Sequence, residues 1–222
     1  MDIKTAYQSD HQKNIETLLN SAGRWLRIFH EKLGNMNMEE GPFFDASIQN
    51  AMEKYLETVE TTSGLDFSAL RKKLDAAQDE FKNTTITHGL LHRDFNCANV
   101  LVSNDGRIGV LDFHFGRGPI YIDIAKILTD IQTYSLQSFS QGNFINARLM
   151  TRFHQSVLKG YFGDEVLNDK ALNFYSVFAI LEKWQADEEK LLEGKDKLII
   201  RLLAPFRRNY YMRLASSYAA KL

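Results

Sequence analysis

The sequence predicts a mainly helical α+β protein in which a small β ribbon lies between two helical stretches. Apolar residues recur every three or four positions before about residue 83 and again after Tyr121, which is the period of amphipathic helices. Between these stretches, residues 84–120 contain short runs rich in Ile, Val, Leu and Thr. Asn104-Asp105-Gly106 separates two of these runs, which is a strong β-hairpin signal. We therefore expect a single domain over residues 1–222.

Composition and charge bound the function classes. The 222 residues carry 27 Lys and Arg against 28 Asp and Glu, a net charge of −1. This balance leaves no excess of positive charge of the kind that binds nucleic acid or an anionic membrane. The single cysteine, Cys97, excludes an intrachain disulfide framework and a Cys-cluster zinc site. No apolar leader opens the sequence, and the run LIIRLLAPF is too short to span a bilayer and is broken by Arg201. We expect a cytoplasmic protein with no nucleic-acid partner and no membrane partner.

The first stretch is expected to form three helices. In residues 16–33 the apolar side chains recur at spacings of three and four, at Leu18, Leu19, Ala22, Trp25, Leu26, Phe29 and Leu33. A loop that contains Gly34, Gly41 and Pro42 should follow. Two further helices are expected over residues 46–61 and 67–82, because Ser63-Gly64 punctuates the chain between them.

The central stretch is expected to bring three polar side chains together. Val100–Ser103 and Ile108–Asp112 should pair as an antiparallel hairpin. Asp94 and Asn99 precede this hairpin, and Asp112 ends its second strand. Because a hairpin returns the chain to its starting point, Asp112 should lie beside the loop that carries Asp94 and Asn99.

From Tyr121 onward the chain is expected to be helical again. The segment IDIAKILTDIQTY has apolar residues at one helical face: Ile124, Ile127, Leu128 and Ile131. A second helix is expected over residues 171–192 and a last one over 197–220, bent near Pro205. The aromatic residues of this region are interpreted as core: Phe174, Tyr175, Phe178 and Trp184.

The three polar residues of the central stretch suit phosphoryl transfer. Magnesium takes oxygen ligands, usually one or two protein groups together with phosphates. The Asp112 carboxylate and the Asn99 amide oxygen would supply them, and Asp94 would accept or orient the proton of an attacking hydroxyl. Transfer of a γ-phosphoryl group needs little beyond positioning and charge neutralisation.

Two motifs resemble a known family. HRDFNCAN, at 92–99, resembles the catalytic loop H-R-D-x-x-x-x-N of the protein-kinase superfamily, and Asp112-Phe113 resembles its metal-binding D-F. The continuation GPIYIDIA, at 118–125, is similar to the aminoglycoside phosphotransferase and choline-kinase branch. AGRWLRIFHEK, at 22–32, resembles the helix that leads into the C-terminal lobe in that branch. The specific part of the resemblance covers residues 88–125.

The resemblance implies a role for each matching residue. Asp94 would be the catalytic base or hydroxyl-orienting group. Asn99 and Asp112 would hold Mg²⁺ and with it the ATP. His92 would brace the catalytic loop from behind. Asp123 would cap the following helix and tie the loop down.

The resemblance also implies a kinase-like C-terminal lobe, with a catalytic segment at 84–125 and a helical substrate region at 126–222. Kinase-like enzymes place an ATP-binding lobe before this region, with a Gly-rich loop and a strand lysine. Upstream of residue 84 the sequence contains neither G-x-G-x-x-G nor a V-A-I-K-like strand. We therefore expect the N-terminal lobe to be absent from this chain, and a separate N-terminal-lobe chain or self-association as a partner.

The leading hypothesis is an ATP- and Mg²⁺-dependent phosphotransferase whose acceptor is a hydroxyl of an aminoglycoside, a sugar or an amino alcohol. The alternative is a non-catalytic, pseudokinase-like binding or regulatory domain, which the missing lysine and Gly-rich loop favour. A third hypothesis is a metal hydrolase, although the glutamate of H-E-x-x-H is missing. Its site would use His88, His92, Asp94, Asp112 and His114.

The remaining reactive or charged residues have plain structural interpretations. Cys97 is interpreted as a packing residue rather than a redox-sensitive thiol. In the resembled family, acidic residues of the C-terminal region attract cationic substrates, but a solvated helix face is the interpretation we favour. These acidic residues are Glu182, Asp187, Glu188, Glu189 and Glu193. The basic residues are expected at the surface as well: Arg201, Arg207, Arg208 and Arg213.

Overall fold

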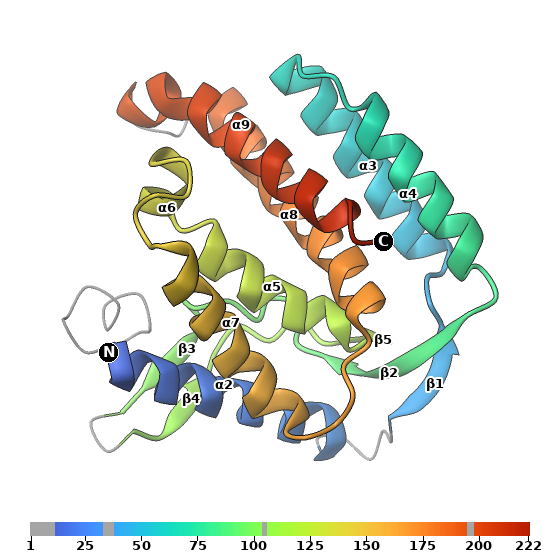
Figure 1. The fold of residues 1–222 in the computed structure, drawn as a ribbon, viewed down its shortest axis with the longest axis vertical. Helices are drawn as coiled ribbons and strands as arrows, with labels where there is room; N and C mark the ends of the chain where they lie inside the picture. The colour runs from blue at the N-terminus through green and yellow to red at the C-terminus, as the bar shows by residue number, and fades with distance from the viewer. Residues whose placement is uncertain (1–11, 33–37, 104–105, 195–197) are drawn as a thin grey trace. The chain divides into compact units, whose positions relative to one another are not determined.

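The structure of the protein, a computed structural model, describes residues 12–32, 38–103, 106–194 and 198–222 (Figure 1). The predicted fold class is confirmed, because the described residues are mainly helical with small antiparallel sheets. Leu33, Gly34 and the Asn104-Asp105 part of the predicted turn lie outside the described residues. Within the described ranges, no helix combines the length and the apolarity that crossing a bilayer requires.

The chain divides into two compact units, each assembled from three separate stretches. The first, called here the loop unit, comprises Met1–Gly41, Thr87–Ile131 and Ile145–Asn168. The second, called the helical unit, comprises Pro42–Ile86, Gln132–Phe144 and Asp169–Leu222. The expectation of one domain, with a catalytic segment at 84–125 and a substrate region at 126–222, stays a prediction.

The loop unit combines helices with the strands on either side of the HRDFNCAN segment. Its helices are α2 (Gln12–Lys32), α5 (Tyr121–Gln132, apart from its last residue) and α7 (Ala147–Phe162). Its strands are most of β1 (Glu39–Pro42) and β2 (Thr85–Leu91), then β3 (Val100–Val102), β4 (Ile108–Val110) and β5 (Gly116–Pro119). Most of the predicted apolar stripe of α2 is buried, with Leu19, Ala22, Leu26 and Phe29 at most 1% exposed, whereas Leu18 and Trp25 are only partly buried.

Two small sheets position the central loop. One has the strand order β1-β2-β5, and β2 pairs antiparallel with β5 from His88 opposite Pro119 to Leu91 opposite Gly116. The other is the predicted hairpin of β3 and β4, in which Val100 lies opposite Val110. The hairpin is confirmed, but its second strand ends at Val110. Asp112 therefore follows the strand instead of ending it.

Strand β1 lies where the sequence predicts a loop, and β5 is a strand that the sequence does not predict. Their sequences, EEGP and GRGP, contain charge, glycine and proline, which favour turns over strands in isolation. Both lie next to the apolar strand β2 in the three-stranded sheet. Tertiary pairing with β2 therefore outweighs the local preference.

Helices α2 and α7 cross at very short range. A Cβ added to Gly23 would lie 2.2 Å from the Val157 carbonyl oxygen, and one added to Gly160 would lie 2.0 Å from the Asn20 carbonyl oxygen. Each helix therefore presents a glycine to the backbone of the other. Because no larger side chain fits at these positions, the crossing is fixed by the two glycines. Asn20 Nδ2 adds a hydrogen bond of 3.2 Å to the Ser156 carbonyl oxygen.

The helical unit is built on α3 (Ala46–Ser63), α4 (Ser68–Phe81), α6 (Ser135–Phe139), α8 (Asp169–Leu192) and α9 (Leu198–Ala219). Helix α3 begins after Asp45, whose Oδ1 accepts a hydrogen bond of 2.9 Å from Ile48 N, and ends at Gly64 with φ of 68°. An N-cap carboxylate and a left-handed glycine are the expected start and stop signals. Pro205 lies inside α9, which continues past it.

The core of the helical unit confirms one prediction and corrects another. The four predicted core aromatic residues are buried: Phe174, Tyr175, Phe178 and Trp184. The expectation of solvated charged faces is wrong for three residues, because Asp187, Glu188 and Arg207 are 7%, 1% and 7% exposed. They are buried because side chains of α8 and α9 pair with one another. Charge runs in a sequence do not reveal such pairing.

Candidate active site

The loop after β2 carries Asp94 in a backbone held by local side-chain hydrogen bonds. Arg93, at its start, has a positive φ of 67°, which is uncommon for a residue with a side chain. Asn96 Oδ1 accepts hydrogen bonds from Ala98 N at 2.9 Å and from Asn99 N at 3.3 Å. Asn96 Nδ2 donates to Asp94 Oδ1 at 2.9 Å. The asparagine therefore closes the turn and orients the aspartate at once.

Asn99 is the closest partner of Asp94. Its Nδ2 donates to Asp94 Oδ2 at 2.8 Å and to the Asp94 carbonyl oxygen at 2.9 Å. Both amide hydrogens are thereby used inside the loop. The Asn99 side-chain oxygen accepts no hydrogen bond from the described residues, so it is the group that Asn99 can offer to a ligand.

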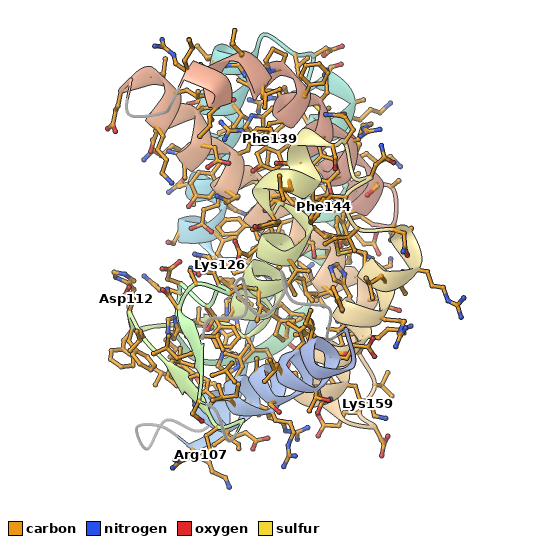
Figure 2. All side chains as sticks on the ribbon, turned by 90° about the vertical axis from the view of Figure 1, so that its left-hand side faces the viewer. Arg107, Asp112, Lys126, Phe139, Phe144 and Lys159 are labelled. Carbon is orange, nitrogen blue, oxygen red and sulfur yellow. The ribbon has the colours of Figure 1, made fainter. Side chains whose placement is uncertain are left out.

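Asp112 is brought to this loop by backbone hydrogen bonds on both sides. Leu111 N donates to the Asn99 carbonyl oxygen at 3.0 Å, and His114 N donates to the His92 carbonyl oxygen at 3.1 Å. Asp112 itself has φ of 55° and is exposed. Figure 2 shows it at the surface, at the end of the hairpin opposite Arg107. Its carboxylate makes no hydrogen bond or ion pair with the described residues.

His92 connects the two segments from the inside. Its Nε2 donates to the Leu111 carbonyl oxygen at 2.9 Å, and its Nδ1 accepts from Asp94 N at 3.2 Å. This pattern requires a neutral ring. Burial lowers the pKa of His92 below its usual value, although the charge of Asp123 acts in the opposite direction. The ring also packs against Phe113, with ring centroids 4.6 Å apart.

Asp123 anchors the start of the loop from below. Its side chain is fully buried, Oδ2 accepts from His92 N at 2.6 Å, and Oδ1 accepts from Arg93 N at 2.8 Å. The expectation that Asp123 caps a helix is corrected, because α5 already begins at Tyr121. The carboxylate is directed to the loop amides instead. Lys126 Nζ adds a hydrogen bond to the Arg93 carbonyl oxygen.

The donor set fits a magnesium–nucleotide better than a transition metal. Two oxygen donors, those of Asn99 and Asp112, are free of other partners among the described residues, and Mg²⁺ prefers one or two such protein ligands with phosphates. The metal-hydrolase hypothesis has no such support. In the described part of the chain, no group of three or more His, Cys, Asp or Glu side chains is placed to hold a metal ion.

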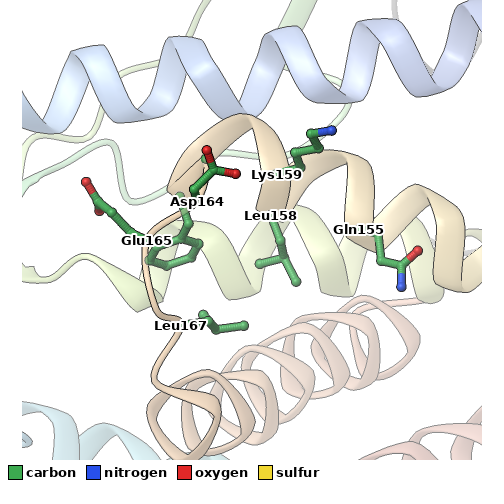
Figure 3. Close-up of a pocket in the computed structure, with 8 residues that line it drawn as sticks. Gln155, Leu158, Lys159, Asp164, Glu165 and Leu167 are labelled. Atoms are coloured by element: carbon green, nitrogen blue, oxygen red, sulfur yellow. The ribbon is translucent and has the colours of Figure 1, made fainter.

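Other features of the loop unit lie away from this set. Cys97 is buried, as expected for a packing residue, and its N–H donates to Asp130 Oδ2 at 3.0 Å. An open pocket of about 430 Å³ lies at the end of α7 (Figure 3). Its lining includes Lys159, Asp164 and Glu165 but none of the site residues predicted from the sequence.

Sequence reasoning missed two residues that contact Asp123 directly or through a neighbour. His30, from α2, is fully buried, and its Nε2 lies 3.1 Å from Asp123 Oδ2. Tyr161, from α7, places its hydroxyl 2.6 Å from His30 Nδ1. A signal for His30 exists, because it lies four residues after the buried Leu26 and thus on the apolar stripe of its helix. No comparable signal marks Tyr161.

Solved structures with the same fold include small-molecule kinases. Choline kinase LicA from Streptococcus pneumoniae has a TM-score of 0.61 and 16% identity, covering 95% of this chain and 66% of its own. A choline/ethanolamine kinase family protein from Mesorhizobium loti has a TM-score of 0.59 and 17% identity, covering 99% and 68%. Amicoumacin kinase hAmiN, solved with AMP-PNP, Ca²⁺ and Ami, has a TM-score of 0.54 and 18% identity, covering 89% and 59%.

The chain thus spans between 59% and 68% of the length of these three proteins. At such identities the likeness shows the fold. No curated protein matches the sequence. The model of the family APH, described as the phosphotransferase enzyme family, matches residues 1–158. This match confirms the resemblance carried by HRDFNCAN and GPIYIDIA, and the chain belongs to the phosphotransferase enzyme family.

Proposed function

We propose that the chain transfers the γ-phosphoryl group of ATP to a hydroxyl of a small molecule, such as an aminoglycoside, a sugar or an amino alcohol. One observation carries the proposal. Asn99 uses both amide hydrogens to orient Asp94, and its oxygen stays available beside the segment that carries Asp112. The family match and the printed names of the similar kinases support the same reaction class.

Asp94 would receive the proton of the attacking hydroxyl. The acceptor oxygen forms a bond to the γ-phosphorus, and the bond from that phosphorus to the β–γ bridging oxygen breaks. The electron pair leaves with ADP, and the hydroxyl proton passes to the Asp94 carboxylate. Two hydrogen bonds, from Asn96 and Asn99, hold this carboxylate in one orientation. Such pre-orientation is the main contribution a protein makes to phosphoryl transfer.

Asn99 and Asp112 would hold the Mg²⁺ that accompanies ATP. When bound, the ion neutralises phosphate charge and orients the γ-phosphoryl group. His92 and Asp123 would act on the protein side, because they fix the backbone that carries Asp94 and Asp112. The AMP-PNP and Ca²⁺ printed for the amicoumacin kinase are consistent with a nucleotide and a divalent cation.

Calorimetric titration with ATP, in the presence and absence of Mg²⁺, tests the nucleotide site. We expect Mg²⁺-dependent binding that Asp112→Asn abolishes. Asp164→Asn is the matched control, because Asp164 is an exposed aspartate of the same unit and lies outside the proposed site. ATP binding that depends neither on Mg²⁺ nor on the Asp112 carboxylate would favour a non-catalytic, pseudokinase-like domain. Absence of binding at millimolar ATP would contradict a nucleotide site in this chain.

Asp94→Asn tests the transfer step separately. Removing a positioned general base lowers the rate by about 10²- to 10⁴-fold. We therefore expect kcat for ADP formation, measured with a panel of hydroxyl acceptors, to fall by that factor while ATP affinity is retained. An unchanged rate would contradict the role of Asp94.

We further propose that a separate N-terminal-lobe chain or self-association takes part. Light scattering with and without ATP tests the self-association, which would appear as a dimer mass.

A further inference from the structure

A buried hydrogen-bond chain runs from α7 through α2 to the catalytic loop. The Tyr161 hydroxyl lies 2.6 Å from His30 Nδ1, and His30 Nε2 lies 3.1 Å from Asp123 Oδ2. Asp123 in turn accepts hydrogen bonds from His92 N and Arg93 N. His30 and Asp123 are fully buried, and Tyr161 is 3% exposed. Side chains of three helices of the loop unit are therefore linked in series, and the last of them, Asp123, bonds the loop.

The chemistry of the groups sets the direction of these bonds. A carboxylate only accepts, so His30 Nε2 must carry a hydrogen. In a neutral ring Nδ1 is then the acceptor, and the Tyr161 hydroxyl donates to it. Burial raises the pKa of Tyr161 well above its usual value, so the hydroxyl retains the proton that this bond needs. Each member of the chain thus fixes the orientation of the next.

The surrounding backbone leaves Tyr161 little freedom to move. Gly160, its neighbour in sequence, lies against the Asn20 backbone at the close crossing of α2 and α7. Arg27, on α2, donates from Nη1 to the carbonyl oxygens of Tyr161 and Phe162 at 3.2 and 3.3 Å. The last turn of α7 is therefore tied to the helix that carries His30. A displacement of Tyr161 would also displace the hydroxyl from His30.

We propose that Tyr161 is a positioning residue for the catalytic loop and acts through His30 and Asp123. Asp123 Oδ1 bonds the N–H of Arg93, the residue with the positive φ that immediately precedes Asp94. Rotation of the Asp123 carboxylate would release this N–H and that of His92. The backbone that precedes Asp94 in the sequence would then lose the hydrogen bonds that hold it in place. The bond from His30 opposes this rotation, and the bond from Tyr161 holds the His30 ring. The proposal rests on the proposed function, since it concerns the placement of its general base.

Tyr161→Phe removes only the hydroxyl and tests the outer end of the chain. Displacing catalytic groups through a supporting residue lowers rates by about 10- to 100-fold. We expect kcat to fall by about 10-fold, with the KM values for ATP and acceptor unchanged within about twofold. Tyr210→Phe is the matched control, because its buried ring loses a hydroxyl bonded to the Gln132 carbonyl oxygen at 2.9 Å in the other unit. Equal kcat losses in both variants would overturn the proposal.

Two substitutions of His30 separate positioning from simple packing. Glutamine places its amide near the position of Nε2, so His30→Gln can still donate to Asp123. Asparagine is shorter and its amide matches the Nδ1 position, so His30→Asn can still bond Tyr161 but can no longer donate to Asp123. We expect His30→Gln, which lacks the acceptor for the Tyr161 hydroxyl, to lose about as much of kcat as Tyr161→Phe, and His30→Asn, which lacks the donor to Asp123, to lose more. Equal activity of the two variants at equal stability would contradict action through Asp123.

Hydrogen exchange of the loop amides tests the same proposal without any activity. We expect faster exchange at residues 92–94 in His30→Asn than in His30→Gln or Tyr210→Phe. One outcome is that the wild-type protein transfers no phosphoryl group while this order of exchange rates is still observed. In that case the proposed function is wrong, but the positioning role of the buried hydrogen-bond chain is supported. If exchange at residues 92–94 is the same in all variants, the positioning chain fails whether or not the protein is active.

Discussion

Both units bury carboxylates, but they satisfy them with different partners. In the loop unit, the Asp123 carboxylate accepts hydrogen bonds from two backbone N–H groups and from one histidine ring. In the helical unit, Glu188 accepts from Arg208 Nε at 2.9 Å and Nη2 at 2.6 Å, and both partners are side chains on helices. A carboxylate bonded to backbone amides fixes the path of a loop. A carboxylate bonded to side chains joins two helices that are already regular.

Asp187 extends this contrast within the helical unit. Its Oδ2 accepts from the Tyr211 hydroxyl at 2.7 Å and lies 3.5 Å from Arg207 Nη1. Glu188 also accepts from Trp184 Nε1 at 3.1 Å. The negative charges of Asp187 and Glu188 are therefore compensated inside the unit. This pairing speaks against these two residues as the charges that would attract a cationic acceptor.

The largest effect that separates the two regions is expected from Asp123→Asn. The amide nitrogen of asparagine would face a backbone N–H where an oxygen now accepts, and a charge-assisted bond would be lost. A buried donor left unpaired costs about 1–3 kcal/mol, and hydrogen bonds to charged groups contribute about 1.5–3 kcal/mol. We expect the free energy of unfolding, measured by urea titration, to fall by about 3 kcal/mol. Loss of phosphoryl transfer should accompany it.

The activity of the remaining folded protein decides what Asp123 does. If Asp123 only stabilises the unit, activity per folded molecule should be unchanged at low temperature, where the variant is still folded. If it positions the loop, activity per folded molecule should fall even there. A variant as stable and as active as the wild type would contradict both roles and would break the comparison.

The sequence predicts the loop better than the buried charges, for a physical reason. HRDFNCAN and the Asp-Gly turn are local patterns, so the places of Asp94, Asn99 and Asp112 follow from a few neighbouring residues. The burial of Asp187 and Glu188 depends on partners about 20 residues further along the chain, on α9. The contact between His30 and Tyr161 spans 131 positions. Pairings at such separations leave no periodic trace in one sequence.

Glu188→Gln tests the helical side of the comparison, with a smaller expected effect. The substitution removes the charge that Arg208 binds with two nitrogens, while the Trp184 bond can persist. Because Arg208 is partly exposed, we expect a loss of about 2 kcal/mol in the free energy of unfolding. Glu189→Gln is the matched control, since the neighbouring Glu189 is exposed. We expect kcat to be unchanged in both variants.

A fall in kcat of folded Glu188→Gln would count against the division of roles between the units. So would a stability loss in Glu189→Gln equal to that in Glu188→Gln, because it would show that burial of the carboxylate is irrelevant. Measuring urea unfolding and kcat on the same preparations distinguishes the two failures.

The smallest effect is a difference in pH dependence. Burial lowers the pKa of His92 from 6.5, so above pH 6.5 the ring is neutral in both the folded and the unfolded chain. Below pH 6.5 the unfolded chain binds a proton at His92 more readily than the folded chain does. The free energy of unfolding therefore decreases as the pH decreases. Burial alone would raise the pKa of Asp187, but Lys183 and Arg207 lower it overall from 3.8, so its contribution is present above pH 3.8 and is lost as pH falls further.

The two regions should therefore lose stability in different pH windows, the loop unit first. His92→Gln keeps a donor for the Leu111 carbonyl oxygen but cannot bind the proton, so urea unfolding between pH 7.5 and pH 5 should show a shallower decline than in the wild type. Asp187→Asn should leave that decline unchanged and alter only the more acidic range. Identical slopes for His92→Gln and the wild type would mean that the ring accepts a proton in the folded loop. The neutral ring inferred from the bonds to Asp94 N and the Leu111 carbonyl oxygen would then be wrong, because a protonated Nδ1 has no lone pair left to accept the Asp94 N–H.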